Sequence, residues 1–359
     1  MTDIKIRAAY ALSKDDFCLA LHEHDEENPN SIMLRYNANQ TPPWTRTDIP
    51  ANVHALEQTG PDDIAALSNE GEVFFFGPDM TDPIKEIIPG AGLDAPHAEG
   101  RGYMMDMANL GGALYAVGYN QQIFIRSLEG KWLSIESQEI KDEAGFGSLH
   151  FYIVDGIHQN DVYILGEHVP KRDVEKRARE HKAYRLALAS EDEARIAAAR
   201  AVYFAPLPED EGRCYHWDGE AWNDVGVPEI VIEACFIETS EKVWIGTADG
   251  LLLMGNAEDG FDEVGETDEG IVSICKFGER MIIATRDSLV EFIPNEDSFH
   301  GETQPIKPKL GKKKGNPLPL LVQGFDDRLV YIDYNHGVYH WDGKDEWTHI
   351  PIPKELRKR

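Results

Sequence analysis

The stretch CYHWDGEAWNDVGVP, residues 214–228, returns near the end of the chain as VYHWDGKDEWTHIPIP, residues 338–353. Both copies contain Tyr-His-Trp-Asp-Gly, followed by a second tryptophan and then a proline. Two copies with matched flanks indicate a repeated structural unit, because modular folds repeat their sequence at a fixed period. The apolar runs in both copies are short and rich in Val, Ile, Tyr and Trp, which favours β-strands.

The same four-part pattern can be followed along the whole chain. Each unit has four short runs, separated by turns that carry acidic residues or an Asp-Gly pair, and the runs are apolar except that the last strand of the sixth unit is degenerate. Seven such units are present, at residues 4–50, 52–90, 103–138, 149–228, 230–266, 271–308 and 318–352. Units of roughly 40–45 residues with four strands are typical of β-propeller blades. The sequence therefore predicts an all-β, seven-bladed β-propeller, with four antiparallel strands per blade and residues 1–359 in one domain.

The spacing of four tryptophans supports this count. Trp44, Trp132, Trp222 and Trp347 each open the predicted fourth strand of a unit. Trp44 and Trp132 are 88 residues apart, which is two units of 44, and Trp222 and Trp347 are 125 residues apart, which fits three units. Trp132 and Trp222 are 90 residues apart where one unit is expected, so blade four contains an insertion. We expect these indoles to cover the apolar gaps between blades, with each N–H bound to a polar partner.

Residues 171–204 make up this insertion. They are rich in Ala, Glu, Arg and Leu and contain neither Gly nor Pro, which favours helix. Ser190 and Glu193 form a capping box that predicts the start of a second helix. We therefore predict a helical hairpin that projects from blade four. It is either a tolerated surface insertion, since loops accept extra length at little cost, or a partner-binding arm.

The charge balance excludes several function classes. The chain has 64 Asp and Glu against 35 Lys and Arg, a formal net charge of -29. Such a surface repels nucleic acids and anionic membranes and attracts cationic partners, although acidity also serves solubility alone. There is no apolar run long enough to span a bilayer, no secretory signal and no Cys-x-x-Cys pair. These features predict a cytoplasmic protein.

No catalytic or metal-binding motif is recognisable. Gly-x-Ser-x-Gly, a phosphate loop and a dinucleotide fingerprint are all absent. His22 and His24 lack an identifiable third ligand, and the acidic segment 256–270 lacks the spacing of a calcium loop. We expect no catalytic residue, no metal and no cofactor. An enzyme remains an alternative, because loops at the channel mouth of a propeller can assemble a site that sequence order hides.

Several segments resemble bacterial seven-bladed propellers of the WD40-like and regulator-propeller kind. They are KVWIGTADGLL at 242–252, DVYILGEH at 161–168 and the two Tyr-His-Trp-Asp-Gly phrases. The resemblance covers nearly the whole chain, although the Gly-His and Trp-Asp pairs of WD40 repeats are not regularly placed. Such propellers include enzymes, receptors and scaffolds, so the resemblance implies an architecture and names no function.

The acidic charge and the predicted arm are similar to those of propeller-fold immunity proteins. Such proteins neutralise a cognate toxin, often a nuclease delivered by a contact-dependent or type VI secretion system. We therefore expect a non-enzymatic propeller, monomeric on its own, that binds and occludes a basic toxin. A generic scaffold or sensor propeller is the alternative, besides the enzyme. The predicted partner-binding residues are all acidic: Glu191, Asp192, Glu193, Glu209, Asp210, Glu211, Glu258, Asp259, Asp262 and Glu263.

Overall fold

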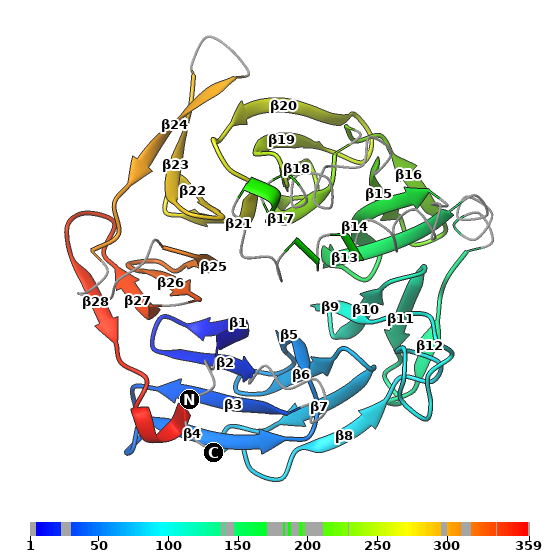
Figure 1. The fold of residues 1–359 in the computed structure, drawn as a ribbon, viewed down its shortest axis with the longest axis horizontal. Helices are drawn as coiled ribbons and strands as arrows, with labels where there is room; N and C mark the ends of the chain where they lie inside the picture. The colour runs from blue at the N-terminus through cyan, green and yellow to red at the C-terminus, as the bar shows by residue number, and fades with distance from the viewer. Residues whose placement is uncertain are drawn as a thin grey trace.

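The computed structural model is a ring of seven four-stranded antiparallel sheets (Figure 1). In every sheet the strands follow chain order, so each blade is a meander of consecutive residues. The predicted all-β, seven-bladed propeller with four strands per blade is confirmed. The structure describes residues 5–22, 30–137, 140, 147–170, 182–183, 186–187, 194–196, 198, 211–228, 230–295, 300–309, 317–334 and 336–357.

The strands are numbered in chain order, and in each blade the first strand is innermost and the fourth lies at the rim (Figure 1). Blades one and two contain β1 (Lys5–Ser13), β2 (Asp16–His22), β3 (Ser31–Asn37), β4 (Trp44–Ile49), β5 (Val53–Gln58), β6 (Ile64–Ser68), β7 (Glu72–Phe76) and β8 (Ile84–Ile87). Blades three and four contain β9 (Met104–Leu110), β10 (Ala113–Gly118), β11 (Gln122–Arg126), β12 (Trp132–Ser134), β13 (Gly147–His158), β14 (Asp161–Pro170), β15 (Glu211–Trp217) and β16 (Trp222–Val225).

The other three blades follow the same plan. Blade five contains β17 (Ile232–Thr239), β18 (Lys242–Thr247), β19 (Leu251–Asn256) and β20 (Gly260–Glu266). Blade six contains β21 (Ile271–Phe277), β22 (Arg280–Thr285), β23 (Leu289–Pro294) and β24 (Gly301–Ile306). Blade seven contains β25 (Pro319–Gly324), β26 (Leu329–Asp333), β27 (Gly337–Trp341) and β28 (Trp347–Ile350), and a 3-10 helix, η2 (Lys354–Arg357), follows it.

The gaps between the blades form the core. Successive side chains of a strand face opposite sides, so a second strand that is covered on both faces is apolar at nearly every position. In β6, Ile64 and Ala66 pack toward blade one, whereas Ala65 and Leu67 pack toward blade three, and all four are fully buried. Each of the seven gaps holds one such apolar cluster. The blades therefore stabilise one another, since none can bury both of its faces alone.

All four rim tryptophans pack in these gaps as predicted, and the predicted polar partner of the indole N–H is present for Trp132 and Trp222. Trp132 donates its indole N–H to Glu86 Oε2 of blade two over 3.0 Å. Trp222 donates to the carbonyl oxygen of Ile135, which follows β12 of blade three, over 3.2 Å. Both indoles are buried in the gap before their own blade. Their role is structural, since each satisfies its polar atom while it fills the space between two sheets.

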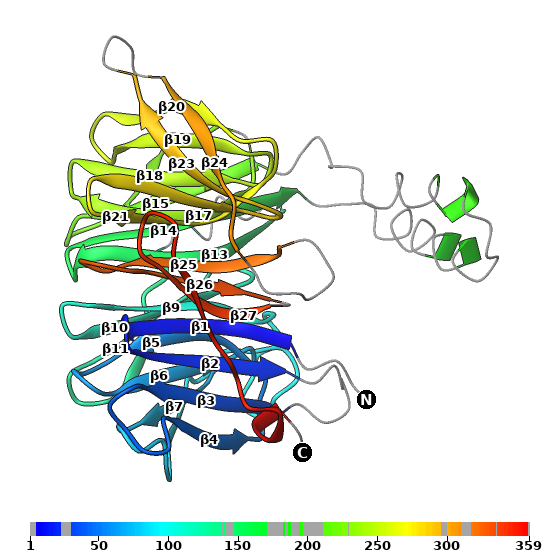
Figure 2. The ribbon, with the colours of Figure 1, turned by 90° about the vertical axis from the view of Figure 1, so that its left-hand side faces the viewer.

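The ring closes without exchange of strands. β1 pairs with β2 in blade one, and β28 pairs with β27 in blade seven. Side chains join the two blades: Gln323 Oε1 accepts a hydrogen bond from the backbone N–H of Ala11 over 3.2 Å, and Lys14 forms an ion pair of 2.8 Å with Asp327. After blade seven the chain crosses to blade one, where η2 lies beside β4 (Figures 1 and 2).

The insertion lies between β14 and β15, the second and third strands of blade four, as predicted. Most of residues 171–204 lie outside the described residues, so the predicted helical hairpin is not confirmed. The described residues of this stretch have helical backbone: 182–183, 186–187, 194–196 and 198. Among the described residues, no helix has the length and apolar character needed to cross a lipid bilayer.

Candidate interaction site between blades five and six

The predicted partner-binding residues that the structure describes lie at opposite ends of the strands and on a rim strand. Glu258 and Asp259 lie in the turn between β19 and β20, which joins the third and fourth strands of a blade. Glu211 begins β15, at the second-to-third connection and therefore at the opposite end of the strands (Figure 2), where it pairs with Arg213 over 2.5 Å. Asp262 and Glu263 lie on the rim strand β20. The other five lie outside the described residues: Glu191, Asp192, Glu193, Glu209 and Asp210.

A groove of about 650 Å³ lies between the rim strands β20 of blade five and β24 of blade six. Four carboxylates line it, from Glu263, Glu266, Asp268 and Glu302. Thr303 connects its two walls, because its hydroxyl donates a hydrogen bond of 3.3 Å to the carbonyl oxygen of Glu266. Of the predicted residues, Glu263 lines this groove. We call it the acidic groove.

The register of blade seven explains why most gaps have no such groove. Trp347 on β28 pairs with Trp341 on β27, and Trp341 pairs with Leu329, which stands four residues before the end of β26. The two indoles stack with ring centroids 5.4 Å apart. They lie in the apolar cluster between blades six and seven and close that gap at the rim.

Blade six has a different residue at the equivalent position. Met281 stands four residues before the end of β22, and it pairs with Phe292, which in turn pairs with Thr303. Thr303 therefore occupies the register position of Trp347, and the rim strand β24 contains no tryptophan. Without an indole in this position, the gap between blades five and six stays open at the rim. Sequence reasoning noted only that this last strand was degenerate and missed this consequence.

The carboxylates of the acidic groove lack compensating charge. Glu263, Glu266, Asp268 and Glu302 are exposed, and none has a Lys or Arg partner in the described part of the chain. Residues 256–270 contain no basic residue at all. Two carboxylates on other rim strands are paired: Glu86 with Arg126 at 2.6 Å and Asp48 with Arg46 at 2.7 Å. Negative potential therefore concentrates at this groove, because low-dielectric walls focus the field of unpaired charges.

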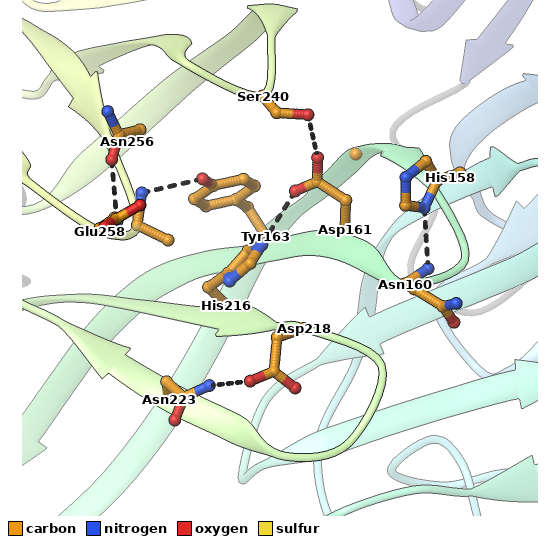
Figure 3. A network of polar contacts seen from close by, with 12 residues as sticks. His158, Asn160, Asp161, Tyr163, His216, Asp218, Asn223, Ser240, Asn256 and Glu258 are labelled. Atoms are coloured by element: carbon orange, nitrogen blue, oxygen red, sulfur yellow. Dashed lines mark hydrogen bonds and ion pairs between the residues drawn. The ribbon is translucent and has the colours of Figure 1, made fainter.

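The blade-four copy of the repeated Tyr-His-Trp-Asp-Gly motif takes part in hydrogen bonds that connect blades four and five, whereas in the blade-seven copy His340 Nε2 is buried without a hydrogen-bond partner among the described residues. In blade four, His216 Nε2 lies 2.8 Å from Asp161 Oδ1, and Asp161 Oδ2 accepts a hydrogen bond of 2.6 Å from the Ser240 hydroxyl of blade five (Figure 3). The Tyr163 hydroxyl accepts a bond of 3.1 Å from the backbone N–H of Ala257. Asp218 accepts two backbone N–H groups in the turn that its glycine neighbour makes possible. These hydrogen bonds join blades four and five and fix the turn at Asp218.

Three carboxylates on innermost strands were missed by sequence reasoning. Glu57, Asp106 and Asp155 lie on β5, β9 and β13, which surround the axis of the ring (Figure 1). Burial raises the pKa of Asp106 to about 7 and that of Asp155 to about 6, and burial with the charges of the other two raises the pKa of Glu57 well above its usual range. Each stands roughly 50 residues from the next, so only the closed ring brings them together.

Among the described residues, no group of three or more His, Cys, Asp or Glu side chains is arranged to hold a metal ion. His22 Nε2 lies 2.8 Å from the Ser31 hydroxyl, and burial lowers its pKa to about 4. His24 lies outside the described residues. The His-x-His pair thus shows one member in a structural hydrogen bond.

No protein-family model matches the chain, and no curated protein matches its sequence. Solved propellers resemble it in structure. A catalytically inactive virginiamycin B lyase from Staphylococcus aureus, solved with quinupristin, has a TM-score of 0.61 and 9% identity, covering 97% of this chain and 96% of that chain. YCF48 from Cyanidioschyzon merolae has a TM-score of 0.59 and 11% identity, with 96% and 97% covered. The WD40 β-propeller domain of Doa1 has a TM-score of 0.58 and 8% identity, with 96% and 95% covered.

These likenesses extend over nearly the full length of each chain and establish the fold. At such low identity they carry no function across, since one fold hosts many unrelated activities. The propeller is compatible with a protein-interaction scaffold. The predicted similarity to immunity proteins is not tested by these comparisons.

Proposed function

We propose that this chain is a protein-binding propeller whose partner is a basic protein and which catalyses no reaction. The observation that carries the proposal is the acidic groove, where four exposed carboxylates stand without a basic partner in the described part of the chain. Like charges crowded at one place repel each other, so their arrangement costs stability in the free protein. A cationic partner removes that repulsion when it binds.

The groove and the overall charge act at different stages of binding. The net charge of -29 accelerates the encounter with a basic protein from any direction. Once the partner arrives, Lys or Arg side chains enter between β20 and β24 and form ion pairs with Glu263, Glu266 and Glu302. Because these carboxylates are exposed, each pair alone contributes little, and the affinity depends on several pairs that form together.

The specific partner that we propose is a cognate toxin domain, such as a secreted nuclease. A nuclease must hold phosphates with a cationic surface, and an acidic propeller bound there would occlude it. The chain would then serve as an immunity protein in the cytoplasm of the toxin-producing cell. This form of the proposal is supported by the charge balance and by the groove.

The test is a pull-down from the native organism with purified protein, at low and at high salt. We expect a stoichiometric basic protein that is retained at low salt and released at high salt. A variant with Glu263→Gln, Glu266→Gln and Glu302→Gln should lose it. The matched control removes three exposed carboxylates elsewhere, through Asp62→Asn, Asp82→Asn and Glu129→Gln, and should retain it. Equal retention by both variants, or an acidic partner, contradicts the proposal.

A further inference from the structure

A second cavity, of about 320 Å³, lies in the same gap between blades five and six. Its floor is apolar and is formed by Trp244, Met254 and Val264 of blade five with Met281 and Phe292 of blade six. Trp244, Met281 and Phe292 are more than nine-tenths buried. Phe292 is the strand partner of Thr303, so this cavity and the acidic groove both lie where the rim indole is missing.

The polar side of this cavity is an ion cluster that joins the two blades. Glu238 accepts hydrogen bonds from Lys276 at 2.7 Å, from Lys242 at 3.1 Å and from the Trp244 indole at 3.3 Å. Burial opposes ionisation of Glu238, but these three donors outweigh it and lower the pKa to about 2. Both oxygens of Glu238 are engaged, so a cationic ligand would meet two ammonium groups and a carboxylate that is already satisfied. A second carboxylate, Glu279, also lines the cavity, but it is 98% exposed and lies 3.9 Å from Lys276, beyond hydrogen-bond distance.

The two lysines keep donor capacity for a ligand. An ammonium group has three N–H donors, and Glu238 uses one from each lysine. The side chains of Lys242 and Lys276 are 43% and 36% exposed, so their ammonium groups reach the mouth of the cavity. Cationic donors at the mouth and an apolar floor behind them match a ligand with an anionic head and an apolar body.

We propose that the cavity between blades five and six binds a small amphipathic carboxylate. Its apolar chain or ring packs against Trp244, Met281 and Phe292, and its carboxylate accepts hydrogen bonds from Lys242 and Lys276. The volume is at the lower end of the range for small-molecule sites, roughly 300–1,000 Å³. This site is distinct from the acidic groove, and its occupancy does not depend on a protein partner.

The test uses decanoate as the probe, followed by isothermal titration calorimetry and ligand-observed NMR on the full chain. Decanoate should bind saturably. Decan-1-ol, which lacks the charged head, should bind with an affinity at least about tenfold lower. Lys276→Met should weaken decanoate about tenfold, whereas Lys276→Arg should retain binding. Met254→Trp places an indole in the cavity and should abolish binding. Lys85→Met, on rim strand β8 of blade two, is the matched control and should change nothing.

Thermal unfolding of each variant verifies that it folds, and Met254→Phe replaces Met254→Trp if the larger residue is not tolerated. Decylamine serves as the cationic control, because it can associate with this acidic protein at many places. Any decylamine binding should be insensitive to Met254→Trp and to Lys276→Met. The proposal is overturned if decanoate does not bind saturably, or if its affinity is the same in the wild type, the cavity-filled variant and Lys276→Met. Decylamine binding that is lost on filling the cavity would equally overturn it.

Discussion

The gap between blades six and seven and the gap between blades five and six are built on the same register but differ in one rim position. In the first, Trp347 stacks on Trp341 and closes the gap. In the second, Thr303 stands opposite Phe292, and two cavities remain. A repeated fold thus turns a missing side chain in one repeat into a surface feature. The blade that departs from the repeat is the place to look for function.

The largest effect is expected where an indole closes its gap. Trp222→Ala should lower the free energy of unfolding by about 3–5 kcal/mol, because it empties a buried site and loses the bond to Ile135. Trp347→Ala should cost less, since Trp347 is only half-buried. Chemical denaturation measures both. Thr303→Ala, in the open gap, should change stability by less than about 1 kcal/mol. An equal loss in all three variants would contradict the comparison.

The next effect concerns Asp106 on the innermost strand β9, beside the gap between blades three and four that Trp222 closes at the rim. There Asp106 accepts a hydrogen bond of 3.0 Å from the backbone N–H of Val154, and burial raises its pKa to about 7. The folded state therefore keeps a proton that the unfolded chain releases above about pH 4, and stability should fall as pH rises from about 4 to 7. Asp106→Asn should stabilise the protein by about 1–2 kcal/mol near pH 8.

The pH profile is the control for that variant. Near pH 5 Asp106 is protonated in the folded wild type, so Asp106→Asn should differ little from it there. Denaturation curves at both pH values measure the difference. A variant that is destabilised to the same extent at both would show that Asp106 is ionised in the folded state, against the raised pKa.

A smaller effect should follow from filling the open gap. Thr303→Trp introduces the residue that blades one, three, four and seven have at this rim position and should raise stability by about 1 kcal/mol through apolar burial. It should also weaken the binding of a basic partner to the acidic groove. Denaturation and partner retention measure the two effects. A strong loss of stability would indicate that blade six has no room for the indole.

The smallest effect concerns the hydrogen bond between Asp161 of blade four and Ser240 of blade five. Ser240→Ala removes the hydrogen bond of 2.6 Å to Asp161 and should cost about 0.5–1 kcal/mol. Ser134→Ala, at an exposed position of β12, is the control and should be neutral. Amide exchange at Ser240 and its neighbours would localise the loss. No difference between the two variants would mean that this bond adds nothing to the blade contact.

The sequence predicts the blades well because each blade repeats a local pattern. The four rim tryptophans and the Asp-Gly turns lie at fixed distances along the chain, so the period reveals both the number of blades and the place of the insertion. The acidic groove was only partly foreseen. Glu263 was named from its acidic segment, whereas Glu302 belongs to the neighbouring blade. The sequence did contain a signal. Two rim strands lie between Trp222 and Trp347: β20 contains Phe261, whereas β24 of blade six contains neither Phe nor Trp.

The rest depends on closure of the ring. Glu57, Asp106 and Asp155 come from three blades and share no motif, so no local pattern connects them. The cavity beside Glu238 likewise combines Lys242 of one blade with Lys276 of the next. Contacts of this kind arise from how sheets face each other, and single-strand periodicity carries no information about them.

Blades made only of consecutive residues also affect how this protein is made. During synthesis, each sheet can be completed as soon as its own four strands have left the ribosome, because no early strand has to wait for the last one. The final event is the docking of two finished sheets through Gln323, Asp327 and the apolar residues around Phe17. The seam between the first and last blades is therefore where the ring can open while every backbone ladder stays intact.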